Sequence, residues 1–218
     1  MTPPTAPPPA RRRYVTETEL LHDAYRLGVR IANSGFRPSF IVGLWRGGSA
    51  VGIYVQECLQ RLGIETDHIA IRTSYRGLPG YAAMVGDPDA EIRVHGTQYL
   101  LETVGHEDGL LIVDDVFGSG STMRAVTSRL ASRLKRNLPA TVRTAAVWYR
   151  PGPDLVGGDR AGPDYRVHET ADWLVMPYEL AGLSHAELRA HKPWAAAILD
   201  ELEPAAGESS GARRGPGA

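Results

Sequence analysis

The segment Leu110–Thr122 constrains the fold more than any other part of the chain. It opens with a run of apolar residues, of which Ile112 and Val113 are β-branched, and this run predicts a strand buried on both faces. Asp114 and Asp115 stand where that strand is expected to end. A loop of glycine, serine and threonine follows, and then a stretch with helical spacing. A strand, a polar turn and a helix in this order indicate an open α/β sheet, whose ligands bind outside the carboxyl ends of the strands.

The polar half of this segment has the chemistry of a site for a phosphorylated sugar. A helix N-terminus preceded by small residues offers backbone N–H groups to a phosphate. Two adjacent carboxylates, Asp114 and Asp115, can accept hydrogen bonds from a vicinal diol. Asp114, Ser119 or Ser121 alone could cap the following helix, but together with their neighbours they favour binding. The segment is therefore interpreted as a site for ribose that carries a 5′-phosphate.

Strands and helices alternate along the rest of the chain. A capping box of Thr16 and Glu19 begins a helix expected at about residues 17–33. In chain order we then expect a strand at 40–45, a helix at 49–62, strands at 66–73 and 92–96, a short helix at 97–104, a helix to about 137, strands at 141–149, 165–170 and 172–179, and a last helix to about 202. That last helix starts with a capping box of Ser184 and Glu187 and is kinked or divided at Pro193. This order predicts a mostly parallel sheet with helices on both faces.

The two ends of the chain differ in composition from its middle. Residues 1–13 are rich in proline and end in three arginines, and residues 204–218 are rich in glycine, alanine and serine. Both segments are expected to be disordered, which leaves one domain at residues 14–203. A chain of 218 residues with 43% hydrophobic residues can bury the core of such a domain.

Charge and composition exclude several classes of protein. The formal net charge of −1 gives no argument for a nucleic-acid partner, so a phosphate site must be local. No apolar run reaches the roughly 18 residues of a membrane span, and the N-terminus has no apolar secretion signal, so no membrane partner and a cytoplasmic location are expected. The single cysteine, Cys58, is expected to be a buried structural thiol. A P-loop motif does not occur, and GSGST lacks the third glycine of a dinucleotide fingerprint.

The motifs together resemble those of the type I phosphoribosyltransferases. The apolar run, two acids and Ser-Gly-Ser-Thr loop are similar to the family's signature for phosphoribosyl pyrophosphate (PRPP). The similarity is greatest to the 6-oxopurine enzymes, the hypoxanthine, guanine and xanthine phosphoribosyltransferases, and it covers most of residues 38–180. It implies an α/β fold with a mostly parallel twisted sheet, a flexible lid loop and a small hood.

The resemblance assigns the residues that would bind PRPP. It places Asp114 and Asp115 on the ribose hydroxyls. It places the following loop on the 5′-phosphate: Val116, Phe117, Gly118, Ser119, Gly120, Ser121 and Thr122. The turn of Trp45, Arg46 and Gly47 corresponds to the pyrophosphate site, where the family often has a non-proline cis peptide. By itself an Arg-Gly-Gly turn is also typical of a tight connection with a solvated arginine.

The remaining assignments concern a lid and the base. Residues 74–91 are too long for a plain connector and predict an active-site lid or an extended hairpin, and Ser74 and Tyr75 correspond to the family's lid pair. Arg150, before a proline, corresponds to the residue that reads a purine oxo group. Trp173 would stack on the base, although a tryptophan here could also belong to the core, and Leu174 would offer backbone groups to the base edge.

The resemblance also implies an activity, which is transfer of the phosphoribosyl group from PRPP to a purine in nucleotide salvage. Asp114, Asp115 and Arg46 would be catalytic, Mg²⁺ would be the cofactor near Asp115 and Glu179, and the protein would be a dimer or tetramer. Two departures keep alternatives open. Gly118 stands where many 6-oxopurine enzymes have an aspartate that assists removal of the purine N7 proton, and Arg150 replaces a lysine. The alternatives are a different acceptor base, or a non-catalytic regulator that binds PRPP or a nucleotide.

Overall fold

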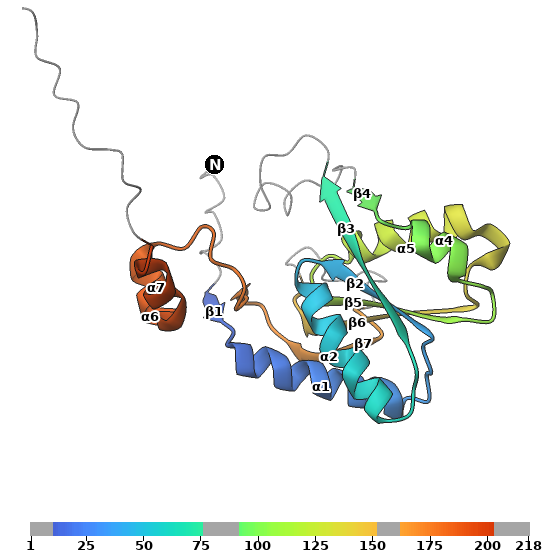
Figure 1. Cartoon of the computed structure of the whole chain (residues 1–218), viewed down its shortest axis with the longest axis horizontal. Coiled ribbons are helices and arrows are strands. Elements are labelled where there is room, and N and C mark those ends of the chain that lie inside the picture. Colours follow the sequence, from blue (N-terminus) through green and yellow to red (C-terminus); the bar gives the residue numbers. More distant parts are fainter. Residues whose placement is uncertain (1–10, 76–91, 152–161, 203–218) are drawn as a thin grey trace, which may run out of the picture. The chain divides into compact units, whose positions relative to one another are not determined.

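The computed structural model describes residues 11–75, 92–151 and 162–202, and within these ranges its centre is a six-stranded sheet (Figure 1). The strands are β2 (Phe40–Trp45), β3 (Asp67–Tyr75), β4 (Ile92–His95), β5 (Gly109–Phe117), β6 (Thr141–Tyr149) and β7 (Tyr165–Glu169). They lie in the order β4-β3-β2-β5-β6-β7, and every neighbouring pair is parallel except β3 and β4. The predicted mostly parallel α/β sheet is confirmed.

Helices cover both faces of this sheet (Figure 1). On one face are α1 (Glu17–Asn33) and α2 (Gly47–Arg61), and on the other are α4 (Gln98–Thr103) and α5 (Ser121–Leu134), which a 3₁₀ turn at Lys135–Asn137 continues. The predicted cap of α1 is present, since the Thr16 side chain accepts a hydrogen bond from the Glu19 N–H at 3.1 Å. Among the described helices, none is long and apolar enough to cross a membrane.

The hydrophobic core explains why β5 is apolar at consecutive positions. Leu110 and Ile112 belong to a cluster on the α4 and α5 side that also contains Val126 and Leu130 of α5. Side chains on a strand alternate between the two faces, so the residues between them face the opposite layer. All of Leu110–Val113 is at most 1% exposed, which fits a strand covered on both sides. Burying each of these side chains stabilises the fold by about 1.5–3 kcal/mol.

Strand β5 extends further than its apolar run predicts. The expected end at Asp114 and Asp115 is wrong, because β5 continues to Phe117. Its pairing with β2 stops at Val113, whereas its pairing with β6 continues to Phe117. The reason is that β6 still pairs with β5 up to Phe117, whereas at Leu44 and Trp45 strand β2 pairs only with β3. The two acids therefore lie where β5 has separated from β2 and is still paired with β6.

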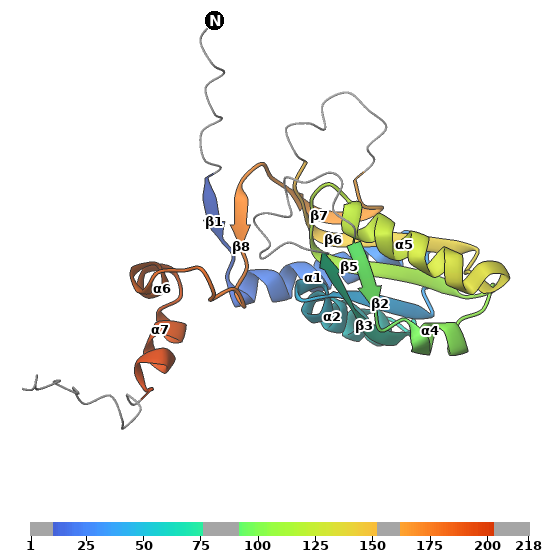
Figure 2. The same ribbon diagram turned by 90° about the horizontal axis from the view of Figure 1, so that it is seen from above.

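A second, two-stranded sheet joins β1 (Arg12–Tyr14) to β8 (Trp173–Val175) in parallel (Figure 2). Composition assigns Arg12 and Arg13 to a disordered arm, and this assignment is wrong because both residues lie in β1. Their order depends on contacts with residues distant in the sequence, which composition does not show. The strand expected at 172–179 is shorter than predicted, and it pairs with β1 and not with the central sheet.

The chain divides into two compact units, residues 1–176 and 177–218. In the second unit, α6 (His185–His191) begins with the predicted capping box of Ser184 and Glu187. Pro193 begins α7 (Pro193–Asp200), so it divides the helix predicted to run to about 202. The Lys192 Nζ donates to the Pro177 and Glu179 carbonyls at 2.9 and 2.7 Å. The predicted domain limit at 203 remains a prediction. Residues 1–10 of the predicted arm, the predicted tail at 204–218 and most of the predicted lid, at 76–91, lie outside the described residues.

Candidate functional site

The carboxyl ends of four parallel strands bring most of the predicted site residues to one edge of the sheet. Trp45 ends β2 and lies level with Arg72 of β3. Asp114 and the following residues lie in β5, and the Arg150 N–H donates to the Phe117 carbonyl at 2.8 Å directly after β6. Sites in open α/β sheets form at this edge, outside the carboxyl ends of the strands.

Gly48 brings the start of α2 against the acid pair. A Cβ at this position would lie 2.3 Å from the Val113 carbonyl oxygen and 3.1 Å from Asp114 Oδ1, so only glycine fits. The Gly48 backbone also forms a hydrogen bond to the Asp114 carboxylate. The sequence identifies the turn that contains Gly48, but it does not predict that Gly48 packs against β5. The only hint of this packing is that the turn has a second glycine.

The turn before Gly48 has the backbone that the resemblance implies. The peptide bond between Trp45 and Arg46 is cis, and both side chains are exposed. Gly47 is buried and begins α2. An anion near this turn would find the start of a helix with an arginine immediately before it, and both favour negative charge.

The two acids form an electrostatically strained pair. The Asp115 N–H donates to Asp114 Oδ1 at 3.0 Å. Burial raises the pKa of the Asp114 carboxyl well above its ordinary value, and the neighbouring Asp115 charge raises that pKa further. Hydrogen-bond donors or a cation that approached the pair would relieve the repulsion between the carboxylates. The hydroxyls of a ribose are donors of this kind.

The loop after β5 is shaped for an anion. Gly120 has a left-handed backbone, with φ of 73°, and it is the N-cap residue of α5 without a capping side chain. A phosphate can therefore take the place that a capping side chain usually fills. The Ser119 hydroxyl accepts a hydrogen bond from the Ser121 N–H at 3.3 Å and donates to the Ser121 hydroxyl at 3.0 Å, so the two hydroxyls lie together at the helix start.

Arg124 belongs to this loop, although sequence reasoning missed it. Its Nη1 donates to the Ser119 carbonyl at 2.8 Å, and its Nη2 donates to the Ser121 hydroxyl at 3.0 Å. A Cβ at Gly120 would lie 2.9 Å from the same Nη1, so the guanidinium lies directly against the loop. The signal in the sequence is an arginine in the first turn of the helix that follows a glycine- and serine-rich loop.

The predicted base-binding residues Arg150 and Trp173 come together next to the ends of β5 and β6. The Arg150 guanidinium carbon lies 4.7 Å from the centre of the Trp173 ring, a cation–π contact. Leu174 is 7% exposed, so its side chain packs inside and only its backbone could meet a ligand. Phe117 and Tyr149, at the paired ends of β5 and β6, make an edge-to-face contact at 5.8 Å beside Arg150.

Two other groups of predicted site residues are only partly placed. The backbones of Ser74 and Tyr75 end β3 opposite Arg93 and Ile92 of β4, and the lid predicted beyond them is not described. Glu179 belongs to the second unit, so its pairing with Asp115 around a metal remains a prediction. In the described ranges, no group of three or more His, Cys, Asp or Glu side chains is arranged to hold a metal ion.

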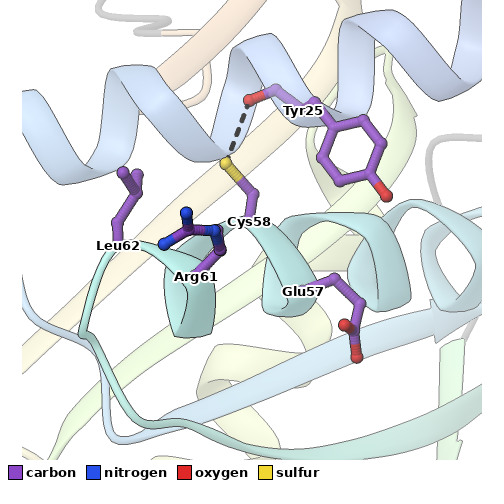
Figure 3. Close-up of a pocket in the computed structure, with 5 residues that line it drawn as sticks. All are labelled: Tyr25, Glu57, Cys58, Arg61 and Leu62. Carbon is purple, nitrogen blue, oxygen red and sulfur yellow. Dashed lines mark hydrogen bonds between the residues drawn. The ribbon is translucent and has the colours of Figure 1, made fainter.

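A separate pocket of about 350 Å³ lies between α1 and the far end of α2 (Figure 3). Its lining includes Tyr25 and Cys58, whose thiol Sγ lies 3.5 Å from the Tyr25 carbonyl oxygen as a hydrogen-bond donor. Burial raises the pKa of the Cys58 thiol, which disfavours the reactive thiolate. The predicted buried structural thiol is confirmed, and this pocket is distinct from the carboxyl edge of the sheet.

Comparison with known proteins identifies the fold. No protein-family model and no curated protein sequence matches the chain. A purine phosphoribosyltransferase from Pyrococcus horikoshii is 20% identical, with a TM-score of 0.54 over 79% of this chain and 97% of that chain. The xanthine-guanine-hypoxanthine phosphoribosyltransferase of Helicobacter pylori is 13% identical, with a TM-score of 0.54 over 78% and 95%. A hypothetical protein from Neisseria gonorrhoeae with bound ppGpp is 16% identical, with a TM-score of 0.61 over 87% and 98%.

These similarities show that the chain has the type I phosphoribosyltransferase fold. Two of the three solved structures are purine phosphoribosyltransferases, so the resemblance drawn from the motifs is confirmed at the level of the fold. At these identities the similarity shows the fold alone, and the chemistry depends on the residues of the site.

Proposed function

We propose that the protein transfers a 5-phosphoribosyl group from PRPP to a purine base and releases pyrophosphate. The observation that carries the proposal is the close approach of Gly48 to Asp114. This approach brings the start of α2, which Arg46 precedes, to the two carboxylates of β5. The loop that leads into α5 follows directly after β5. A donor with a pyrophosphate, a vicinal diol and a 5′-phosphate matches these three features in order.

The reaction breaks the bond from the ribose C1 to the pyrophosphate oxygen and forms a bond from C1 to a purine nitrogen, which gives up its proton. Asp114 and Asp115 orient the ribose through its hydroxyls. The Arg46 guanidinium stabilises the negative charge that develops on the leaving pyrophosphate. Mg²⁺, when bound, offsets the same charge. The crowded carboxylate pair suits a divalent cation, and we assign Asp115 to it.

Charge at the carboxyl edge supports an anionic donor. Arg46, Arg72 and Arg124 are exposed at this edge, and Arg150 lies directly after β6. The formal net charge of the whole chain is only −1, so these arginines give a local field and not a general one. A local cationic edge attracts a polyanion such as PRPP without making the protein bind nucleic acid.

The base would lie near Arg150 and Trp173. Arginine donates hydrogen bonds in a fixed fork, so Arg150 can read an oxo group of a 6-oxopurine, and Trp173 offers an aromatic face. Ser74 and Tyr75 would belong to a lid that keeps water from the reacting C1 atom. Salvage of 6-oxopurines is the role that this arrangement favours.

Calorimetric titration with PRPP and Mg²⁺ tests the donor site directly. We expect the wild type to bind PRPP, and the Asp114→Asn/Asp115→Asn double variant to lose this binding while circular dichroism shows the same fold. Ribose 5-phosphate should bind to the wild type more weakly, because it lacks the pyrophosphate that meets Arg46. Equal affinity of the wild type and the double variant for PRPP would contradict the ribose assignment.

A second candidate function is guanine nucleotide binding without transfer. It is favoured by one specific observation, which is the bound ppGpp in the similar structure from Neisseria gonorrhoeae. Gly118 also lacks the carboxylate that would assist proton removal. Tight binding of ppGpp by the wild type, without phosphoribosyl transfer to any base, would favour this candidate over the enzyme.

A further inference from the structure

We propose that Arg13 is a positioning residue that holds the base-binding strand β8 in place through β1. The inference rests on the proposed function, because it takes Trp173 of β8 as part of the base site. Arg13 touches neither the base nor PRPP in this proposal. It acts on the distance between Trp173 and Arg150, which come from different parts of the chain.

Strand β8 is tied to β1 by backbone hydrogen bonds. The Trp173 N–H donates to the Arg11 carbonyl at 2.8 Å, the Val15 N–H donates to the Val175 carbonyl at 3.0 Å, and Arg13 lies opposite Leu174. A sheet of two short strands is at best marginally stable by itself. The position of β8 therefore depends on the side chains that fasten the pair to the rest of its unit.

The Arg13 side chain makes two contacts of this kind, one with Trp148 and one with Glu19. Its guanidinium carbon lies 4.3 Å from the centre of the Trp148 ring, and its Nη2 lies 2.7 Å from Glu19 Oε1 of α1. Trp148 is 1% exposed, and its ring nitrogen has no hydrogen-bond partner among the described residues. The indole is thus held by packing on its ring and not by its polar atom.

The other neighbour of Trp148 is part of a buried polar network. His168 lies beside it in β7, with ring centres 4.2 Å apart, and the His168 Nε2 lies 2.7 Å from Asp23 Oδ2. Asp23 is completely buried, and its Oδ1 also pairs with Arg26 at 2.5 Å. A buried carboxylate with both oxygens occupied makes a rigid neighbourhood, because breaking either contact is costly. This network therefore fixes Trp148.

The contact of Arg13 with Trp148 links the two parts of the proposed base site, Arg150 after β6 and Trp173 in β8. Trp148 lies in β6, two residues before Arg150, and Arg13 lies opposite Leu174, the residue after Trp173. The contact of Arg13 with Trp148 thus joins the two elements whose ends meet at the cation–π contact of Arg150 with Trp173. If Arg13 is removed, β8 can move relative to β6, and the base loses a preorganised site.

Kinetics of the Arg13→Ala variant test this role. We expect the KM for the purine base to rise about tenfold, the KM for PRPP to change less than about twofold, and Arg13→Lys, which keeps a cation near Trp148, to recover part of the affinity. Arg11→Ala is the matched control, because it removes the same charge from an exposed side chain immediately before β1. Equal increases in both KM values, or a wild-type KM for the base, would overturn the proposal.

Hydrogen exchange gives a readout that does not depend on activity. Peptides that cover residues 171–176 should exchange faster in Arg13→Ala than in the wild type and Arg11→Ala, while peptides of β5 should exchange at the wild-type rate. Unchanged exchange at 171–176 would overturn the role of Arg13 even if the enzyme is active. Faster exchange there in a protein that transfers no phosphoribosyl group would support the role of Arg13 and count against the proposed function alone.

Discussion

The ionised Asp114 carboxylate, which is proposed to bind the ribose, lowers the stability of the folded protein. Burial and the charge of Asp115 raise the pKa of its carboxyl in the folded protein above the unfolded value of about 3.9. The folded state therefore holds the proton more tightly than the unfolded state does. The free energy of unfolding falls as the pH rises from about 3.9 through the raised pKa, because ionised Asp114 is unfavourable where it lies.

The Asp114→Asn variant should be more stable than the wild type at neutral pH and should bind PRPP poorly. Asparagine keeps an oxygen to accept from the Asp115 N–H but removes the charge. Thermal unfolding followed from pH 4 to pH 8 should show a Tm difference that grows with pH. Glu102→Gln, at an exposed carboxylate that accepts a hydrogen bond from the neutral Gln98 side chain, is the control and should show no such growth. A lower Tm for Asp114→Asn at neutral pH would contradict the account.

Gly118 is a position where a side chain can be added. A Cβ there would meet no other described atom within 4 Å, and its φ lies outside the left-handed region. Gly118→Asp should therefore fold normally and supply the carboxylate that many related enzymes use to take the purine proton. We expect turnover with a 6-oxopurine to rise about tenfold or more in steady-state assays, and Gly118→Asn to give no rise. Equal rates for the aspartate and asparagine variants would show that the position has no acid–base role.

Arg124 is expected to bind the 5′-phosphate together with the loop to which it donates hydrogen bonds. Arg124→Ala removes hydrogen bonds to the Ser119 carbonyl and the Ser121 hydroxyl as well as a charge. The KM for PRPP should rise about ten- to a hundredfold, with a smaller effect on the KM for the base. Arg129→Ala, at an exposed position of the same helix, should leave both constants near the wild type. A wild-type KM for PRPP in Arg124→Ala would remove this residue from the site.

At the scale of elements, the junction of α2 with β5 holds the site together. Gly48→Ala places a methyl group 2.3 Å from the Val113 carbonyl, so α2 must shift away from the acids. We expect a loss of about 1–3 kcal/mol in the free energy of unfolding by denaturant and a large loss of PRPP affinity. Gly105→Ala is the matched control, because its added methyl would meet only ordinary contacts. Equal PRPP affinity in Gly48→Ala and the wild type would mean that the junction does not position the donor.

Local patterns predict the elements whose causes are local. The apolar run Leu110–Val113 predicts a buried strand, Thr16 predicts the start of α1, and Pro193 predicts the division of the last helix. Each of these depends on residues within a few positions along the chain. The end of β5 is different, because it depends on the pairing with β6, which continues to Phe117.

Long-range contacts account for what the sequence does not predict. Arg13 lies in an ordered strand because Glu19 and Trp148 hold it, and composition places it in a disordered arm. Gly48 and Arg124 belong to the site because of the backbone groups that they approach. The motif residues Asp114 and Asp115 are found from the sequence alone, because their chemistry shows in their spacing and neighbours.

At the scale of the whole molecule, fold and site point to the same chemistry. The described chain has the fold of purine phosphoribosyltransferases, and its acid pair, helix starts and arginines lie at the edge where such a fold binds ligands. The two departures at Gly118 and Arg150 concern the base and do not affect the residues proposed to bind the ribose and the pyrophosphate. The central claim is therefore transfer from PRPP, and the identity of the base is a finer question.

The most direct test is a transfer assay with the full chain, PRPP and Mg²⁺ against hypoxanthine, guanine, xanthine, adenine and uracil. Pyrophosphate and nucleotide are measured together, so that hydrolysis of PRPP is told apart from transfer. We predict equal amounts of pyrophosphate and nucleotide with at least one 6-oxopurine, and no product when Mg²⁺ is chelated. Folded protein that releases neither product with any base would contradict the account.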